Sequence, residues 1–355
     1  MAEEREEEAD ALSSSPVQKA RGFSSEQMVS CRECERANPP TRMNCLYCGA
    51  ELPFDEANAA LRRPSLRPLE EWEQGFNVVL LPVEASTGSS PAESQREAAE
   101  LLRLEAADFV RIIEARRALP LARAASLEEA GLLEERLKKL GFKVSVVPDE
   151  VLEMGAPMPF RIRRLELSED GLRAQAVGGE TQAVGWRELR ALVRGRLFTR
   201  RVELEERRTH LGMQSEMVDA REIAEDENVL DLFHDADAGQ RHWRIEGDSF
   251  DYSCLGERKA LLAAENFRTL VELLRARAPL AAYDEDYWRV RHLLAFIWPL
   301  AGRTESRGLR RERPGKFNVE SSAVVSNEPQ FTRYARLCFE LRRRSLMSEE
   351  AAAQT

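Results

Sequence analysis

The sequence contains no hydrophobic run long enough to span a membrane. Its longest apolar stretch, residues 293–301 (LLAFIWPLA), has nine residues, whereas a membrane-spanning helix needs about 20. The N-terminus is acidic and has no apolar segment, so it lacks the features of a secretory signal peptide. We therefore expect a cytoplasmic protein with no membrane span.

Standard phosphate-binding loops and internal repeats are also missing. Neither G-x4-G-K-S/T nor a G-x-G-x-x-G following a strand occurs, so phosphate binding through a standard glycine-rich loop is unsupported. We find no internal repeat of useful period. The sequence therefore indicates no small-molecule substrate.

The net charge of −10 argues against attraction of the whole chain to nucleic acid or to an anionic membrane. The charge is unevenly distributed, however. The first ten residues hold six acids and one arginine, whereas residues 307–344 hold ten basic residues and four acids. We interpret the basic segment as a solvated surface, with an RNA-binding site as the alternative.

Four of the six cysteines lie close together near the N-terminus, in the pattern C-x2-C-x10-C-x2-C. They are Cys31, Cys34, Cys45 and Cys48. Two pairs of thiolates, each presented by a tight turn, can complete a closed tetrahedral shell around one ion. A segment of about twenty residues cannot build a hydrophobic core of its own, so a bound ion would supply the missing stabilisation. We predict one structural zinc ion; two disulfides are the alternative, but nothing nearby indicates a secreted chain.

Two family resemblances apply to this segment. The spacing Cys34-x3-Asn38-x6-Cys45 is similar to the Ran-binding-protein type of zinc finger, some of which bind single-stranded RNA or ubiquitin. The run Asn38-Pro39-Pro40 and the pair Cys48-Gly49 resemble the generic bacterial zinc ribbon, which is the interpretation we favour. Both resemblances imply the same four cysteine ligands. We expect Gly49 to adopt a positive φ, so that backbone amides point at the sulfurs.

The composition divides the rest of the chain into modules. We expect an α+β multidomain protein with an N-terminal zinc ribbon, a small α/β module, an antiparallel β-rich module with a covering helix, and a helical C-terminal region. The expected boundaries are 1–27 for a disordered acidic tail, 28–54 for the zinc ribbon, 55–75 for a linker, 76–150 for the α/β module, 158–278 for the β-rich module, 279–348 for the helical region and 349–355 for a disordered tail.

The α/β module has a β-α-α-α-β pattern. An apolar strand over 76–83 precedes a helix start with Ser90 as N-cap, Pro91 and Glu93. A second helix carries apolar residues spaced by three: Leu104, Ala107, Val110 and Ile113. A third begins at the capping box Ser126-x-x-Glu129, and Gly141 ends it before a strand over 142–147. The apolar face of the third helix consists of Ala130, Leu133, Leu137 and Leu140.

Residues 76–147 resemble the C-terminal domain of the bacterial ribosomal stalk protein. The matching segments are the opening strand FNVVLL, the run Leu104-x-x-Ala107-x-x-Val110 and the closing strand FKVSVV. In that family the domain recruits translational GTPases through a Gly-Leu-Gly-Leu-Lys segment. This chain has Leu102-Arg103-Leu104-Glu105 there, so the resemblance implies the fold without that recruitment segment.

In the β-rich module, turn residues separate short segments with a period of two. We expect strands at 160–165, 172–177, 183–186, 192–197 and 230–234, a hairpin joining 242–245 to 250–254, and a helix over 261–277. This arrangement resembles a pleckstrin-homology-like barrel; another antiparallel sheet with a covering helix is the alternative. Farther on, we expect a helix over 287–297, a loop over 302–329, and a last helix that ends at Arg342, Arg343 and Arg344, where these charges complement its dipole.

Few residues suggest catalysis. His234, Asp237 and His242 are a possible second metal site, although a solvated acidic turn explains them as well. Cys254 is a possible nucleophile only if His242 lies beside it on a paired strand. We otherwise interpret Cys254 and Cys338 as buried thiols.

Three functions remain open from the sequence. The leading hypothesis is a non-enzymatic cytoplasmic adaptor that binds protein partners, because each module offers a surface and none offers a reaction centre. The second is association with nucleic acid or the ribosome through the zinc module and residues 307–344. The third is an enzyme that uses Cys254 or the group His234, Asp237 and His242.

Overall fold

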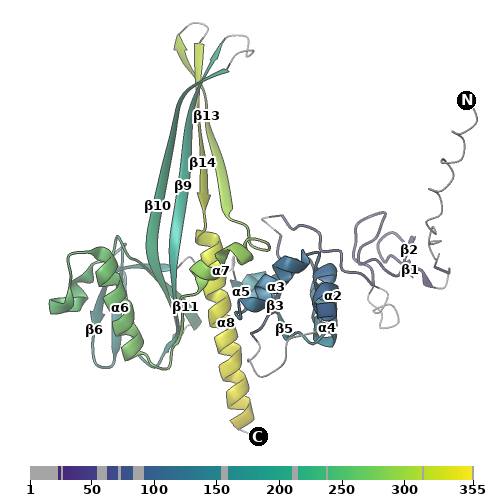
Figure 1. The fold of residues 1–355 in the computed structure, drawn as a ribbon, viewed down its shortest axis with the longest axis horizontal. Helices are drawn as coiled ribbons and strands as arrows, with labels where there is room; N and C mark the ends of the chain where they lie inside the picture. The colour runs from purple at the N-terminus through teal and green to yellow at the C-terminus, as the bar shows by residue number, and fades with distance from the viewer. Residues whose placement is uncertain are drawn as a thin grey trace, which may run out of the picture. The chain divides into compact units, whose positions relative to one another are not determined.

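The computed structural model shows an α+β protein whose chain divides into two compact units, Met1–Ser65 and Leu66–Thr355. Figure 1 labels the elements of both units. The structure describes residues 23–24, 27–53, 62–70, 73–82, 92–152, 159–209, 215–236, 239–313 and 316–353. Most of the expected acidic tail, the Ser90-Pro91 helix start and Asp237 lie outside these residues.

The first unit contains two short hairpins. In one, β1 (Val29–Ser30) pairs with β2 (Ala37–Asn38) in antiparallel fashion. In the other, Asn44 and Glu51 form an isolated antiparallel bridge. The side chains buried between the hairpins belong to Val29, Cys31, Cys45 and Leu52. Two of these four are expected metal ligands, so the small core and the metal centre coincide.

The segment expected to be a linker, 55–75, is divided between the two units. Arg62 is only 1% exposed, and its guanidinium donates to the carbonyl of Leu52 at 3.3 Å. On the other side of the boundary, the N–H of Leu66 donates to Glu129 at 2.9 Å. Each half of the segment is therefore held by the unit to which it belongs.

The second unit begins with the α/β module. Its elements are β3 (Phe76–Leu80), α2 (Ala92–Leu102), α3 (Ala106–Glu114), β4 (Leu119–Ala124), α4 (Leu127–Lys139), β5 (Val144–Pro148) and α5 (Asp149–Leu152). The sheet has the order β4-β3-β5 and is antiparallel. The expected β-α-α-α-β pattern is wrong because it lacks β4. That strand contains Pro120 and lies at the sheet edge, where a missing N–H is tolerated.

Helix α4 confirms the sequence prediction. The Ser126 hydroxyl accepts a hydrogen bond from the N–H of Glu129 at 3.3 Å, and Gly141 follows the helix with φ 89°. Ala130, Leu133 and Leu137 are fully buried. The Glu129 carboxylate accepts hydrogen bonds from the N–H groups of Ala125 and Leu66.

One large sheet dominates the remainder of the unit. Its strands are β6 (Phe160–Leu167), β7 (Gly171–Ala176), β8 (Thr181–Gly185), β9 (Leu189–Thr209), β10 (Ser215–Ala236), β11 (Gly239–Glu246), β12 (Ala282–Asp284), β13 (Ala301–Arg313) and β14 (Lys316–Ser326). They follow the order β13-β14-β9-β10-β11-β6-β7-β8, with β12 beside β9. All pairs are antiparallel except β11–β6 and β12–β9.

The expected hairpin between residues 242–245 and 250–254 does not form. Strand β11 pairs with β10 and β6 instead, and Tyr252–Arg258 form a short 3-10 helix, η2. The carboxylate of Asp251 accepts from the N–H of Ser253 at 2.9 Å. A side chain that caps the backbone in this way starts a helical turn and competes with strand pairing.

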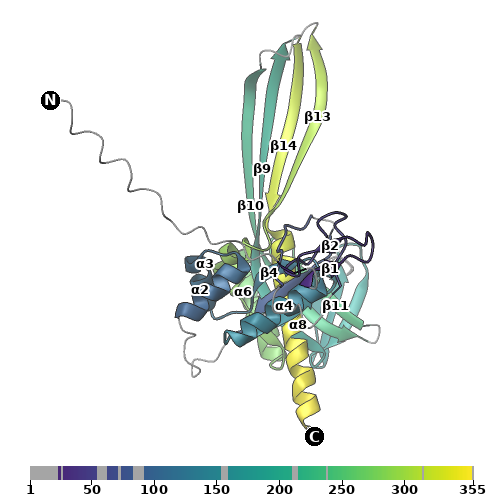
Figure 2. The same cartoon turned by 90° about the vertical axis from the view of Figure 1, so that its right-hand side faces the viewer.

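Residues 302–329 are not a loop, as we expected, but mostly strands β13 and β14. They extend the sheet beside the distal parts of β9 and β10. Figures 1 and 2 show these four strands running side by side away from the rest of the unit. We call them the arm: residues 199–209, 215–226, 301–313 and 316–326. The Gly, Arg and Ser content of β13 is typical of a loop, so the sequence did not predict a strand there.

In the part of the sheet that contributes to the hydrophobic cores, helices pack on both faces. The expected face of α6 (Ala263–Arg277), including Phe267 and Leu270, packs with Leu230 and Leu232 of β10. Helix α8 (Glu328–Ala353) packs on the opposite face, where Phe339 stacks on Phe233 at a centroid distance of 4.9 Å. Helix α7 (Tyr287–Leu294) joins the same core as α8.

Helix α8 is longer than the sequence indicated. It continues to Ala353, past the expected end of order at residue 348, because its last residues include strong helix formers. Arg343 and Arg344 therefore lie inside the helix and not at its C-terminus. Both donate to the nearly buried carboxylate of Glu340, at 2.7–2.9 Å, so their role is side-chain pairing and not dipole compensation.

Candidate metal centre

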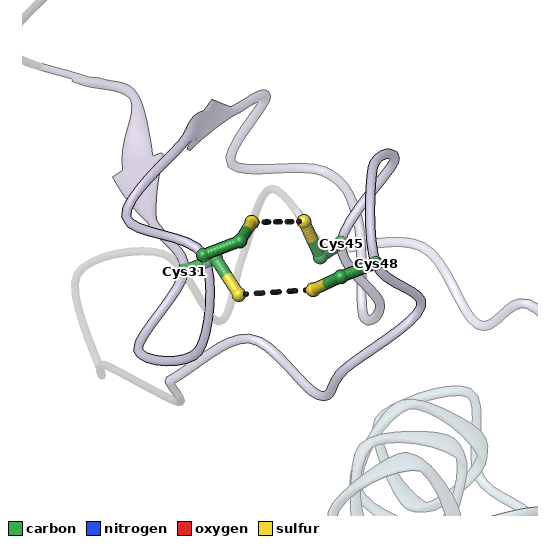
Figure 3. Close-up of side chains that lie close together, drawn as sticks. Cys31, Cys45 and Cys48 are labelled. Carbon is green, nitrogen blue, oxygen red and sulfur yellow. Dashed lines mark hydrogen bonds between the residues drawn. The ribbon is translucent and has the colours of Figure 1, made fainter.

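The four cysteines of the N-terminal motif converge in the first unit. Their sulfurs all lie within 4.8 Å of one another. The Sγ atoms of Cys31 and Cys48 are 3.6 Å apart, and those of Cys34 and Cys45 are 3.5 Å apart. Figure 3 shows the labelled side chains turned toward a common centre. Each pairing joins a sulfur of one hairpin to a sulfur of the other.

These distances fit one tetrahedral ion. Metal–sulfur bonds of about 2.3 Å in a tetrahedral shell place the sulfurs about 3.8 Å apart. The sulfurs are too far apart for disulfides, whose S–S bond is about 2.05 Å, and all six cysteines of the chain are free. The donor set therefore suits a single closed metal site, as the sequence predicted, and the disulfide alternative does not apply.

The two hairpins present their ligands in the same way, fourteen residues apart. The N–H of Cys31 donates to the carbonyl of Arg36, and the N–H of Cys45 donates to that of Ala50. Likewise, Glu35 donates to the carbonyl of Cys31, as Gly49 does to that of Cys45. The centre is thus built from a short internal repeat of backbone geometry, which the sequence did not reveal.

The same equivalence explains two unusual backbone angles. Gly49 has φ 75°, as predicted, and Glu35 has φ 58° at the corresponding position. Each residue follows the second cysteine of its C-x2-C turn. The turn requires a left-handed residue there, which glycine adopts without strain and glutamate does not.

Asn38 ties the two hairpins together at the metal centre. It is completely buried. Its amide donates to the carbonyl of Arg36 at 2.8 Å and approaches Sγ of Cys45 at 3.5 Å, while its oxygen accepts from the N–H of Leu46 at 2.8 Å. The sequence spacing drew attention to Asn38, but only the structure gives it this positioning role.

Hydrogen bonds favour the thiolate form of one ligand. Burial raises the pKa of Cys45, but the N–H groups of Tyr47 and Cys48 donate to its sulfur and lower that pKa to about 6. The N–H of Ala50 lowers the pKa of Cys48, whereas burial and the neighbouring thiols raise it to about 12. Four sulfurs this close cannot all ionise without a compensating cation, so the centre is preorganised for a positive ion.

The turn that carries the last two ligands also presents an exposed surface. Leu46 and Tyr47 are 52% and 56% exposed. The guanidinium of Arg36, from the other hairpin, lies 4.8 Å from the centroid of the Tyr47 ring. An apolar side chain, an aromatic ring and a cation are therefore fixed next to the metal centre by the backbone that holds the sulfurs.

The second expected metal site is not assembled in the described residues. The ring of His234 packs against Trp243, at a centroid distance of 4.4 Å. That of His242 stacks on Phe233 on the other face of the sheet. His242 belongs to a buried charged cluster, in which its Nε2 lies 2.7 Å from Asp231 although the two atoms are not aligned for a hydrogen bond. Arg244 pairs with Asp231 through two bonds, at 2.7 and 2.8 Å.

Cys254 does not have the environment that the nucleophile hypothesis requires. It lies in η2, whereas His242 lies in β11, so the two do not occupy paired strands. Burial raises the pKa of Cys254 to about 11, which disfavours the reactive thiolate. Cys338, on α8, also has its pKa raised by burial, consistent with a packing role.

The basic segment 307–344 does not form one continuous surface element. It is divided between the arm and α8. Among its described side chains, Arg344 pairs with Glu340 and also donates to the carbonyl of Val146, while Arg336 donates to that of Leu152. These arginines hold α8 against the α/β module.

Sequence reasoning also missed Arg62, whose buried guanidinium ties the chain beyond the second hairpin to the metal-binding unit. Nothing in a Pro/Arg-containing segment distinguishes a buried arginine from a solvated one.

Among the helices of the described ranges, none is long and apolar enough to cross a membrane. We found no match for this chain among known protein families, curated proteins or solved structures.

Proposed function

We propose that this chain is a zinc-binding adaptor that holds protein partners in the cytoplasm. The observation that carries the proposal is the closed set of four sulfurs next to the exposed residues Leu46 and Tyr47, which lie in the turn between two of the ligands. Zinc is the ion best suited to four thiolates at tetrahedral spacing. A site with four protein ligands leaves no open position for a substrate, which favours a structural role over a catalytic one.

The zinc ion would act by fixing a recognition surface. Tyr47 lies between the ligands Cys45 and Cys48, and its N–H lies 3.4 Å from the sulfur of Cys45. Loss of the ion would release this turn and with it the arrangement of Leu46, Tyr47 and Arg36. Partner binding should therefore depend on the metal although no partner atom touches it.

A nucleic-acid partner at this surface is the second candidate. An aromatic ring with a neighbouring arginine is a combination that binds single-stranded nucleic acid by stacking and charge, and Tyr47 and Arg36 provide it. The two candidates use the same residues, so they differ in the partner and not in the surface.

The test is a crosslinked pull-down from native cytoplasm with three baits: wild type, Cys45→Ser, and the double variant Leu46→Ser/Tyr47→Ser. Each bait is used with and without nuclease. The double variant is the matched control, because it alters the exposed surface and retains all four ligands; its zinc content should equal that of wild type.

The adaptor proposal expects protein partners that survive nuclease and are lost with both variants. Partners lost on nuclease treatment would instead favour the nucleic-acid candidate. Partners retained by both variants would contradict a role of this surface, and an enzymatic activity unaffected by loss of zinc would contradict the proposal as a whole.

A further inference from the structure

Among the described residues, two edges of the arm have no neighbouring strand. Strand β13 pairs there only with β14, and β10 pairs only with β9 over residues 215–226; farther along, the N–H of Gly247 donates to the carbonyl of Asn228, and β11 joins β10 at residue 229. An exposed strand edge offers a row of free backbone donors and acceptors and is a template for pairing with another chain. The two edges have similar lengths, 13 residues in β13 and 12 over 215–226.

The residues along the two edges have opposite charge. Strand β13, Ala301–Arg313, contains five arginines and two glutamates. Residues 215–226 of β10 contain five acids and one arginine. Two of these acids, Glu222 and Asp226, pair with Arg200 and Arg196 of β9, but five acids against three arginines still leave this edge acidic. Charge of one sign on both edges would prevent self-association; opposite charges promote it.

We propose that β13 of one copy of this chain pairs with β10 of a second copy, so that the arms assemble edge to edge into a larger sheet. The strand directions permit this. In the order β13-β14-β9-β10 every neighbouring pair is antiparallel, so β13 and β10 run in opposite directions. When two arms point the same way, β13 of one continues the antiparallel pattern beside β10 of the other.

The charges also select this contact over the symmetric ones. A two-fold contact would place β13 beside β13 or β10 beside β10, and each puts like charges opposite one another, which destabilises cross-strand pairs. The favoured contact joins two different edges, so an open assembly of any length still has one free basic edge at one end and one free acidic edge at the other. Contacts of this kind continue into a ring or a filament and do not stop at a dimer.

Sedimentation velocity of the full chain, over a range of protein and salt concentrations, tests this proposal. The first variant, Arg303→Glu/Arg310→Glu, makes both edges acidic. The second, Glu216→Arg/Asp219→Arg/Glu225→Arg, leaves residues 215–226 with two acids and four arginines and so makes both edges basic. Neither variant should associate with itself, and an equimolar mixture of the two should assemble, because each variant supplies the edge that the other has lost.

We expect the average mass of the wild type to rise with protein concentration and to fall as salt screens the contact. Mass equal to a single chain at all concentrations, or reversed variants that assemble as strongly as wild type, would overturn the proposal. A mixture that stays unassembled although both variants melt like wild type would also overturn it.

A second measurement needs no variant. Amide exchange of the wild type should slow with rising protein concentration in β13 and in residues 215–226, and remain unchanged in the inner strands β14 and β9. Concentration-dependent protection elsewhere, with none at these edges, would contradict edge pairing.

Discussion

Two residues, Glu35 and Gly49, occupy equivalent places in the turns that hold the sulfurs, and both have a positive φ. The left-handed conformation costs a residue with a Cβ about 1–2 kcal/mol, so the first turn contains a strain that the second avoids. This difference can be measured because the two turns are otherwise alike in their hydrogen bonds.

Glu35→Gly should therefore stabilise the metal-binding unit. Relief of the strain outweighs the added chain entropy of glycine in the unfolded state, and we expect a net gain of about 0.5–1 kcal/mol. A competition titration should show zinc bound about two- to fivefold more tightly. Glu33→Gly is the matched control, since Glu33 has no positive φ; it should weaken binding. Equal effects of the two variants would contradict the strain at Glu35.

At His242 the structure predicts a dependence of stability on pH. Burial lowers the pKa of this imidazole, more than the neighbouring Asp231 raises it, while Arg244 and Arg336 also lower it. The unfolded chain therefore takes up a proton below about pH 6.5, where the folded chain does not. Stability of the second unit should fall as pH drops from 7 to 5, by up to about 1.4 kcal/mol per pH unit.

Denaturant unfolding at a series of pH values, with His242→Gln beside wild type, isolates this contribution. The variant should lose most of the slope between pH 7 and 5. Asp231 does not contribute in this range. Burial raises the pKa of its carboxyl group, but Arg244 and His242 lower that pKa by more than burial raises it. The stability that Asp231 contributes is therefore lost only in stronger acid. An unchanged slope in the variant would assign the pH dependence to other groups.

At the scale of elements, the sequence predicted correctly those features that depend on residues close together in the chain. The capping residue Ser126, the apolar face of α4 and the stop at Gly141 were all evident in the sequence, as were the spacing and convergence of the four cysteines. Each depends on residues within a few turns of one another. The resemblances to the ribosomal stalk domain and to a pleckstrin-homology-like barrel stay predictions.

Elements that depend on distant partners were missed. Strand β4 was not predicted: it contains Pro120, and β3, the strand that pairs with it, lies far earlier in the chain. Residues 302–329 were predicted to be a loop, and most of them form strands because β9, about a hundred residues earlier in the chain, supplies the neighbouring ladder. The role of Asn38 between the hairpins was likewise visible only once both were in place.

The contact between α8 and β9 depends on the absence of a side chain at Gly195. A Cβ there would lie 2.3 Å from the Phe331 ring, which is fully buried. Gly195→Ala should therefore force the helix away from the strand and destabilise the second unit by about 1–3 kcal/mol. Gly302→Ala is the control, because a Cβ at Gly302 meets no atom within 4 Å. Chemical denaturation of both variants should separate them; equal stabilities would contradict the close approach.

At the scale of the whole molecule, the α/β module is joined to the rest of the second unit by buried hydrogen bonds. The indole of Trp298 donates to Asn77 at 3.0 Å, and Asn77 donates to Asp149 at 2.8 Å. The side chain of Gln330 donates to the carbonyl of Trp298 at 2.7 Å. These contacts link β3, α5 and α8 in one network, and one hydrophobic core spans the same elements.

Trp298→Phe should consequently lower the stability of the entire second unit. It leaves the buried oxygen of Asn77 without the indole donor, at a cost of about 1–3 kcal/mol. Calorimetry should show one transition at a reduced temperature for residues 66–355. Trp288→Phe is the control, because Trp288 is substantially exposed. A separate early transition of the α/β module would show that it folds alone.

The first unit should depend on its ion in a way that the second does not, because its buried core comprises two ligands and two other side chains. The most direct measurement is amide hydrogen exchange of the full chain, read peptide by peptide, for wild type with zinc, wild type with a chelator, and Cys45→Ser. We predict that residues 27–53 are protected only with zinc and intact ligands, while protection of residues 92–152 is the same in all three samples. Protection of residues 27–53 that survives both chelation and the substitution would contradict a metal-dependent unit, and loss of protection in both regions would contradict its independence.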